Sequence, residues 1–297
     1  MRVIGIGEIL WDELPSGRAI GGAPFNVVAH LARLEHKANY VTAVGSDEPG
    51  RAAIAEVRAR GVSTSLIQVT EAAPTGIARV QTDALGSVRF EIVRPAAFEE
   101  IRLDGAALRR IARQQPGVVV FGTLAQCQSR ALDATAQVCA AAAPGSLRLY
   151  DVNLRSGWWG PGLIIELTRL ASVVKLAEEE ARELSPVFGL AWHGARSFCR
   201  AMAERAGLRC VAVSAGASSA HLWLDGELAQ ARPPAITVAD TVGAGDAFSA
   251  GLLDAMSQGL PAAAALRHAN ALGALIASRQ GAQPTWAPAD LTRLENA

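Results

Sequence analysis

Short apolar runs alternate with longer stretches of helical periodicity along most of this chain. Apolar runs typical of buried strands lie at 3–6, 38–44, 118–121, 147–152, 173–176 and 210–213. Stretches with the periodicity of helices lie between and after them, at 26–35, 50–60, 129–143, 161–171, 178–185, 195–206, 245–258 and 261–278. Strands that alternate with helices in this way predict an α/β fold, in which helices cover both faces of a mostly parallel sheet.

One stretch departs from this alternation. Residues 76–83 and 87–93 alternate apolar and polar side chains around Ala84-Leu85-Gly86, which predicts an antiparallel hairpin. A hairpin inserted into an α/β chain is either a decoration of the sheet edge or a lid over a site. Residues 13–20 can add a further short strand to it. No internal repeat or low-complexity linker divides the sequence, so we expect one domain, 1–297, with a small β flap.

Composition and charge favour a globular protein with a small-molecule partner. Half of the residues are hydrophobic and 19% are charged. The 28 Lys and Arg residues balance the 28 Asp and Glu residues, whereas nucleic-acid binders normally carry a basic excess. We therefore expect no nucleic-acid partner.

The same sequence predicts a cytoplasmic protein without a membrane anchor. No segment approaches the roughly 20 apolar residues that a bilayer span needs. The apolar run 3–6 is too short, and too soon followed by Glu8, to be a signal peptide. The cysteines form no CxxC pair and lie in Ala- or Val-rich surroundings, which is typical of reduced, buried thiols; they are Cys127, Cys139, Cys199 and Cys210.

Several common site types are excluded by their missing residues. The segment Gly5-Ile6-Gly7-Glu8 begins like a dinucleotide fingerprint, but it lacks the third glycine, and Glu8 would oppose the pyrophosphate. The GxxxxGK[ST] phosphate loop is absent. The five histidines show neither HxxxH nor HExxH spacing, so a zinc site made by the protein is not expected.

The segment Asp240-Thr241-Val242-Gly243-Ala244-Gly245-Asp246 leads directly into an apolar helical run. Small residues at a helix start leave backbone N–H groups uncovered, and such groups bind anions at the positive end of the helix dipole. A carboxylate at the same place would repel a bound anion, so its presence there needs a reason, such as a reaction that uses both the N–H groups and the carboxylate. Phosphoryl transfer needs both, because donors steady the phosphoryl charge while a base accepts the nucleophile's proton. An ordinary capped helix is the alternative interpretation.

With its continuation to Gly251, this segment closely resembles the C-terminal signature of the ribokinase/PfkB carbohydrate kinases. Residues 21–34, which read GGAPFNVVAHLARL, resemble the N-terminal signature of that family. Shorter segments resemble its fructokinase-like branch, at 7–12, 121–125 and 151–155. The resemblance implies a three-layer α/β/α ribokinase-like fold with a β lid from about 13–20 and 74–99. It also implies ATP-dependent transfer of the γ-phosphate to a sugar hydroxymethyl group.

The resemblance assigns the reaction to a few residues. Asp246 matches the general base, and Gly243, Ala244 and Gly245 match the anion hole. Arg155 matches a cationic residue near the phosphate path, with a surface arginine as the alternative.

The sugar side follows from the N-terminal signature. Asp12 matches an acidic residue that holds substrate hydroxyls, although an aspartate at a strand end is also a common turn former. Gly22 would let the backbone approach the sugar, and Asn26 offers a donor and an acceptor unless it serves only as a residue of the helix start. Gln126, which comes just after the stretch 121–125, is a further candidate contact.

The nucleotide side is matched less completely. Ser214 and Gly216 resemble a turn that contacts ATP phosphates and ribose. Asn270 matches a residue that lines the adenine pocket, and Gly281 begins a segment that resembles the loop closing that pocket.

Metal binding is implied with one departure. Many relatives carry Lys-x-Asn-x-x-Glu, whose Asn and Glu organise Mg²⁺ through water, whereas this chain has Lys175, Ala177 and Glu180 at those positions. The glutamate run here is otherwise a solvated helix start. The backbone of Asp240 and Val242 matches a site that holds a monovalent cation such as K⁺ in many relatives.

The resemblance favours fructose, phosphorylated at O6, as the acceptor. The alternatives are 2-keto-3-deoxygluconate, ribose or a nucleoside. A non-catalytic sugar or nucleotide sensor is the alternative of another class, and the intact Asp246 argues against it. Lids in this family often pair between subunits, so a homodimer is expected.

Overall fold

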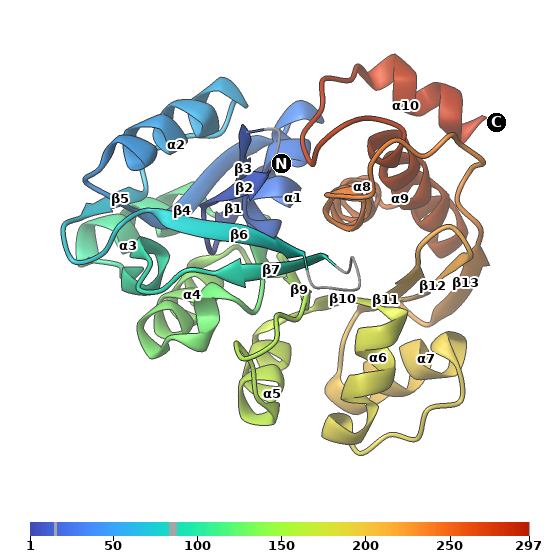
Figure 1. The fold of residues 1–297 in the computed structure, drawn as a ribbon. Helices are drawn as coiled ribbons and strands as arrows, with labels where there is room; N and C mark the ends of the chain where they lie inside the picture. The colour runs from blue at the N-terminus through green and yellow to red at the C-terminus, as the bar shows by residue number, and fades with distance from the viewer. Residues whose placement is uncertain (15–16, 83–87, 297) are drawn as a thin grey trace.

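The residues that the computed structural model describes, 1–14, 17–82 and 88–296, form a nine-stranded sheet and a four-stranded sheet (Figure 1). The large sheet has the order β13-β12-β11-β10-β9-β8-β1-β4-β5. Its strands from β11 to β5 in this order are parallel, and β12 and β13 add an antiparallel edge. The bounds are β1 Arg2–Ile6, β4 Lys37–Gly45, β5 Ile67–Thr70, β8 Val118–Phe121, β9 Leu147–Asp151, β10 Val173–Ala177, β11 Cys210–Ala215, β12 Ser219–Leu224 and β13 Glu227–Ala231.

Helices cover both faces of this sheet, as the sequence predicts. Alternate strand residues point to opposite faces, so Val118 and Val120 of β8 join one core while Val119 and Phe121 join the other. On the first face lie α1 Ala23–Arg33, α2 Glu48–Ala59, α8 Ala244–Ser257, α9 Ala262–Ala277 and α10 Pro288–Glu295. On the second face lie α3 Gly105–Gln114, α4 Ser129–Ala141, α5 Pro161–Leu170, α6 Glu178–Leu184 and α7 Ala195–Ala206. The predicted three-layer α/β fold is confirmed.

The small sheet contains the predicted hairpin. Its order is β3-β2-β6-β7, from β3 Gly17–Gly21, β2 Leu10–Leu14, β6 Gly76–Thr82 and β7 Val88–Ile92. Strands β6 and β7 pair antiparallel, and the expected extra strand from 13–20 is present as parts of β2 and β3. The predicted turn at 84–86 lies outside the described residues. In Figure 1 the hairpin extends from the rest of the small sheet toward the middle of the molecule.

The sequence prediction did not include β5, β12, β13, α3 or α10. None of the helices in the described ranges is both long enough and apolar enough to cross a bilayer.

A buried acid–base cluster joins three of the helices on the first face to the loop before β4. The carboxylate of Asp254 in α8 accepts from His36 at 2.8 Å, from His268 at 2.9 Å and from Gln258 at 2.8 Å. His268 also contacts Glu295 of α10. Burial would raise the pKa of Asp254, but the hydrogen bonds from His268 and His36 hold it well below its usual range. Burial opposes the charge on His268, yet Asp254 and Glu295 outweigh it and raise the pKa of His268.

We predict that Asp254→Asn lowers the free energy of unfolding by about 3 kcal/mol near pH 5–6, because it leaves buried donors without their charged acceptor. The contribution of Asp254 is present above about pH 4 and is lost as the pH falls. The contribution of His268 is present below about pH 6.5 and is lost as the pH rises. Urea unfolding from pH 3 to pH 9 should therefore show the largest difference between the proteins near pH 5–6. Asp225→Asn, which removes an exposed pair with Arg209, should cost less than about 1 kcal/mol, and an equal loss in both variants would contradict this account.

Candidate active site

Polar residues lie at the carboxyl ends of the central strands of the large sheet. Here a cavity of about 260 Å³ is bounded by the ends of β1, β8, β9 and β10, the start of α8 and the small sheet. Its lining includes Glu8, Leu10, Asp12, Gly22, Pro24, Asn26, Ala78, Ile92, Thr123, Leu124, Asn153, Arg155, Lys175, Gly243, Gly245 and Asp246. A crevice at this edge is where open α/β sheets bind their ligands.

Asp246 lies in the first turn of α8, with its carboxylate at this cavity. Its Oδ2 accepts a hydrogen bond from Asn26 Nδ2 at 2.7 Å, while its Oδ1 has no hydrogen-bond partner among the described side chains. Burial and the charge of Asp151 raise the pKa of Asp246 to about 7, against the hydrogen bond from Asn26 and the charges of Lys175 and Arg155. A carboxylate with one free oxygen and a pKa near neutrality is suited to accept a proton.

The start of α8 is kept open for an anion. Gly243 has a φ of +78°, and a Cβ there would lie 2.5 Å from the Cα of Ala282, so only glycine fits. A Cβ at Gly245 would lie 3.0 Å from Nζ of Lys175. The start of α8 therefore lies beside a side-chain ammonium, and the helix dipole and this charge both favour a negative ligand. The N–H of Ala244 is already engaged, because it donates to the carbonyl of Thr241 at 3.2 Å.

Lys175 is fixed in its charged form. The buried ammonium pairs with Asp151 Oδ1 at 3.2 Å, and Ser249 of α8 donates to Asp151 Oδ2 at 2.6 Å. Burial disfavours the charge, but Asp151, Glu180 and Asp246 outweigh it and raise the pKa of Lys175. The positively charged ammonium of Lys175 therefore lies at the cavity, beside the start of α8.

Two further carboxyl groups line the cavity. Burial raises the pKa of Asp12 to about 6, against the charge of Arg155. Glu8 is buried, its Oε1 accepts from the backbone N–H of Ala23 at 3.1 Å, and its Oε2 has no partner among the described residues. Gly22 has a φ of +125°, and a Cβ there would lie 2.4 Å from the carbonyl oxygen of Glu8. Sequence reasoning missed Glu8 as a cavity residue, although its place directly after a buried strand was the available signal.

The turn after β9 carries a cation toward the same cavity. Arg155 donates to Asn153 Oδ1 at 2.8 Å, and both residues line the cavity. Glu180 holds this turn from α6, since its Oε1 accepts from Leu154 N at 2.6 Å and its Oε2 accepts from Ala177 N at 2.8 Å. Both oxygens of Glu180 are therefore engaged by the backbone, and Glu180 does not line the cavity.

A second cavity, of about 270 Å³, adjoins the first at Gly245. Its walls are mostly apolar, with Pro233, Ile236, Val238 and Phe248 among them. Ser214, Gly216 and Asn270, the candidates for the nucleotide side, line it, and Asn270 Nδ2 is a buried donor without a partner among the described residues. Apolar walls with a few convergent polar groups are typical of a site for a flat heterocycle.

Besides Glu180, three predicted residues lie outside the lining of both cavities, namely Gln126, Asp240 and Gly281. Gln126 is buried behind the wall, where its Nε2 donates to the carbonyl of Ile6 at 3.1 Å. Gly281 donates its N–H to Asp240 Oδ2 at 2.9 Å, and Val242 donates to Asp240 Oδ1 at 3.0 Å, so Asp240 ties the two loops together. Within the described ranges, no group of three or more His, Cys, Asp or Glu side chains could hold a metal ion.

Comparisons with known proteins agree with this geometry. The model of the pfkB family carbohydrate kinases matches residues 17–289. Aminoimidazole riboside kinase of Salmonella typhimurium is 30% identical, over 93% of this chain and 89% of its own length. Probable fructokinase-7 of Arabidopsis thaliana is 26% identical, over 97% of this chain and 90% of its own length. The crystal structure of a fructokinase with bound ATP from Xylella fastidiosa shares the fold, with a TM-score of 0.85, 24% identity and coverage of 99% of this chain and 98% of its own.

The match spans most of the chain, and it includes the start of α8, where Asp246 follows the turn 243–245. The chain therefore belongs to the pfkB family of carbohydrate kinases and is an ATP-dependent carbohydrate kinase.

Proposed function

We propose that this enzyme transfers the γ-phosphate of ATP to the hydroxymethyl group of a neutral sugar, with fructose phosphorylated at O6 as the preferred acceptor. The observation that carries the proposal is the junction of the two cavities. There Asp246, whose Oδ1 has no hydrogen-bond partner among the described side chains, directly follows the turn 243–245, and the ammonium of Lys175 lies beside Gly245 of that turn. Asp246 takes the hydroxyl proton as the sugar oxygen bonds to the γ-phosphorus and the bond to the ADP oxygen breaks. The turn and Lys175 steady the phosphoryl charge, and Arg155 adds positive charge along the same path.

The second cavity is proposed to hold the adenosine part of ATP. The unpartnered donor of Asn270 supports this, since a nucleotide acceptor would satisfy it. Ser214 and Gly216 would contact the nucleotide at the rim, with the loop at Gly281 closing the site. Mg²⁺ would be held mainly by the phosphates and water, as is usual for this ion, with Glu180 reaching it only through water. A K⁺ ion at the backbone of Asp240 and Val242 remains part of the proposal.

On the sugar side, Asp12 and the backbone at Gly22 are the proposed ligands, with Asn26 beside them. The cavity is lined by three carboxyl groups, Glu8, Asp12 and Asp246. It is also lined by two cations, Arg155 and Lys175, of which Lys175 is already paired with Asp151. This balance disfavours an acidic acceptor such as 2-keto-3-deoxygluconate, because like charges in a closed site repel.

The apolar wall of the cavity supports a compact acceptor. Its described apolar side chains are aliphatic or proline, namely Leu10, Ala23, Pro24, Ala78, Ile92, Leu124 and Val242. They offer no ring on which a base would stack. A nucleoside remains the second candidate, because one similar protein is named an aminoimidazole riboside kinase.

The small sheet is proposed to act as a lid, since Leu10, Asp12, Ala78 and Ile92 extend from its strands into the cavity wall. We further propose that the lid pairs in a homodimer and that the enzyme works in the cytoplasm. The four cysteines are free thiols, which supports a reducing compartment. A sensor without catalysis would not need a base with a free oxygen, so catalysis is favoured.

We predict that Asp246→Asn lowers turnover by at least about 100-fold while sugar and ATP still bind, because a general base contributes about 10²–10⁴-fold. In the unmodified enzyme the carboxylate must be ionised to accept the proton. Since its pKa is raised to about 7, kcat/KM should rise with pH and level off above about pH 7. Steady-state kinetics and calorimetric binding test both statements. Near-normal turnover in Asp246→Asn would remove Asp246 from the mechanism.

We predict that fructose has a higher kcat/KM than ribose, adenosine or 2-keto-3-deoxygluconate. The reason is the acidic, aliphatic cavity, which suits a neutral polyhydroxy compound. A coupled assay of ADP release across these acceptors measures the order. A tenfold preference for a nucleoside would reject fructose and establish the second candidate.

The replacement at Ala177 gives a prediction about Mg²⁺. An asparagine there would add one side-chain ligand for a metal-bound water, so Ala177→Asn should lower the Mg²⁺ concentration that gives half-maximal rate, by roughly threefold to tenfold. Ala177→Ser, which is shorter, is the matched control and should change it less. Mg²⁺ titrations of the rate at saturating ATP measure the effect, and equal midpoints in all three proteins would show that position 177 does not face the metal.

A further inference from the structure

Both the nitrogen and the oxygen of the Asn26 side-chain amide form hydrogen bonds. Its Nδ2 donates to Asp246 Oδ2 at 2.7 Å, and its Oδ1 accepts from Gln283 Nε2 at 2.6 Å. Asn26 is buried in α1, whereas Gln283 comes from the loop between α9 and α10, 257 residues further along the chain. Three side chains from three elements thus form one line of hydrogen bonds that ends on the proposed base.

The acceptor-only carboxylate of Asp246 sets the orientation of both side-chain amides in this chain of hydrogen bonds. A carboxylate can only accept, so Asn26 must turn its NH₂ toward Asp246 and its oxygen toward Gln283. Gln283 must then turn its own NH₂ toward Asn26. If either amide alone were reversed, two acceptor oxygens would lie less than 3 Å apart, without a hydrogen between them. Gln283 Oε1 has no partner among the described residues, so the bond to Asn26 is the one hydrogen bond recorded for its side-chain amide.

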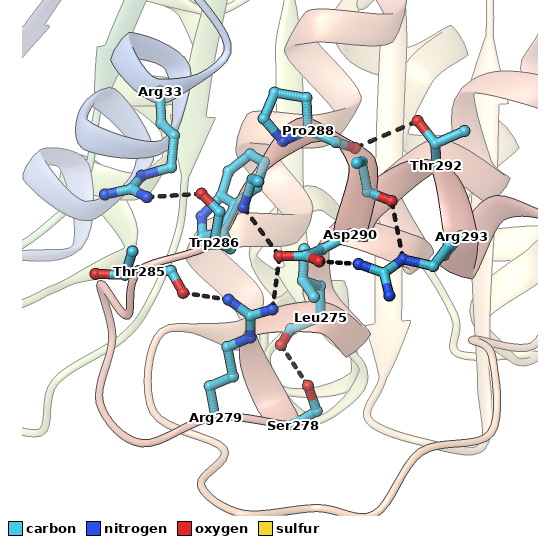
Figure 2. A network of polar contacts seen from close by, with 12 residues as sticks. Arg33, Leu275, Ser278, Arg279, Thr285, Trp286, Pro288, Asp290, Thr292 and Arg293 are labelled. Carbon is cyan, nitrogen blue, oxygen red and sulfur yellow. Dashed lines mark hydrogen bonds and ion pairs between the residues drawn. The ribbon is translucent and has the colours of Figure 1, made fainter.

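The loop that carries Gln283 is held on both sides (Figure 2). After it, Arg33 of α1 donates to the carbonyl of Trp286 at 2.7 Å, and Arg279 pairs with Asp290 at 2.8 Å. Before it, His30 Nε2 lies 3.0 Å from the carbonyl of Ala282. Burial lowers the pKa of His30 to about 4, so its ring is neutral and donates to that carbonyl near pH 7. The loop therefore presents Gln283 to α1 in a fixed position.

We propose that Gln283 is a positioning residue for the phosphoryl transfer, which fixes the orientation of the Asn26 amide and thereby keeps Asp246 Oδ2 as an acceptor and Oδ1 free for the sugar hydroxyl. The proposal rests on the proposed role of Asp246 as the general base. It also gives Asn26 a different task from direct sugar binding, since its oxygen is already occupied by Gln283 and one of its donors by Asp246.

Gln283→Glu tests the direction of the line with almost no change of shape. A carboxylate at 283 can only accept, so it competes with Asp246 for the NH₂ of Asn26. The amide can serve the carboxylate at 283 only by turning its oxygen toward Asp246, which is favourable when Asp246 is protonated and donates to it. The hydrogen bond that favours the ionised base is thus weakened or lost. We expect the acid limb of kcat/KM to move up by about one to two pH units, the effect of one hydrogen bond to a charged group. Gln283→Leu only removes the partner that orients the Asn26 amide. The acid limb of kcat/KM should therefore move in the same direction by a smaller amount, with the KM for ATP little changed.

A new negative charge at 283 could also act on Asp246 through space, and a double variant separates the two effects. In an Asn26→Leu background no amide can reverse, so adding Gln283→Glu should move the acid limb by less than about half of its shift in the unmodified background. Gln280→Leu is the control, because Gln280 lies in the same loop and donates instead to the carbonyl of Ala239. It should leave the acid limb in place.

The outcomes are distinct. An acid limb that stays at the wild-type pH in Gln283→Leu and Gln283→Glu, or an undiminished shift in the Asn26→Leu background, overturns the proposal for Gln283. Full turnover in Asp246→Asn would instead overturn the proposed function itself. If Gln283→Glu does not fold, as judged by its thermal transition, the smaller shift expected for Gln283→Leu decides the matter.

Discussion

A carboxylate and the turn proposed to bind phosphate share the first residues of α8, and most of the site follows from keeping both usable. The helix start at 243–245 and the ammonium of Lys175 attract negative charge, while Asp246 must stay close without pairing with that ammonium. Asp151 provides the separation, since it pairs with Lys175 at 3.2 Å and is itself fixed by Ser249. Burial and the negative charge of Asp151 then raise the pKa of Asp246 to about 7. One buried ion pair therefore serves two functions.

The same constraint explains why the site depends on distant segments. Two of the charged groups depend on partners from another part of the chain, since Asn26 of α1 holds Asp246 and Glu180 of α6 holds the turn of Arg155. Helices α1 and α8 are neighbours on one face of the sheet, whereas α6 lies on the other. The carboxyl ends of the parallel strands are where these two faces meet, so the fold itself brings the groups together.

Sequence patterns predicted the parts of this arrangement that are local. The glycines before Asp246 and the apolar runs of the central strands carry their signal within a few residues, and the prediction of the fold was confirmed. The elements missed have weaker patterns. Helix α3 is rich in arginine and buries only Ile111, and β13 is an edge strand without a buried residue. The role of Gln283 was also missed, because a hydrogen bond across 257 residues leaves no mark in spacing or composition.

Glu180 illustrates how a local match can leave a role open. Its spacing from Lys175 predicted a residue near the metal, yet its two oxygens accept from the backbone of Ala177 and Leu154. The first bond closes the start of α6, where the donor would otherwise be unsatisfied. The second ties that start to the turn of Arg155. An asparagine at 177 would leave both bonds in place, because they involve backbone N–H groups, whereas replacing Glu180 would release the turn. The fold therefore does not depend on the side chain at position 177, whereas it does depend on the carboxylate of Glu180. Loss of Glu180 should alter the placement of Arg155 even where no metal is bound.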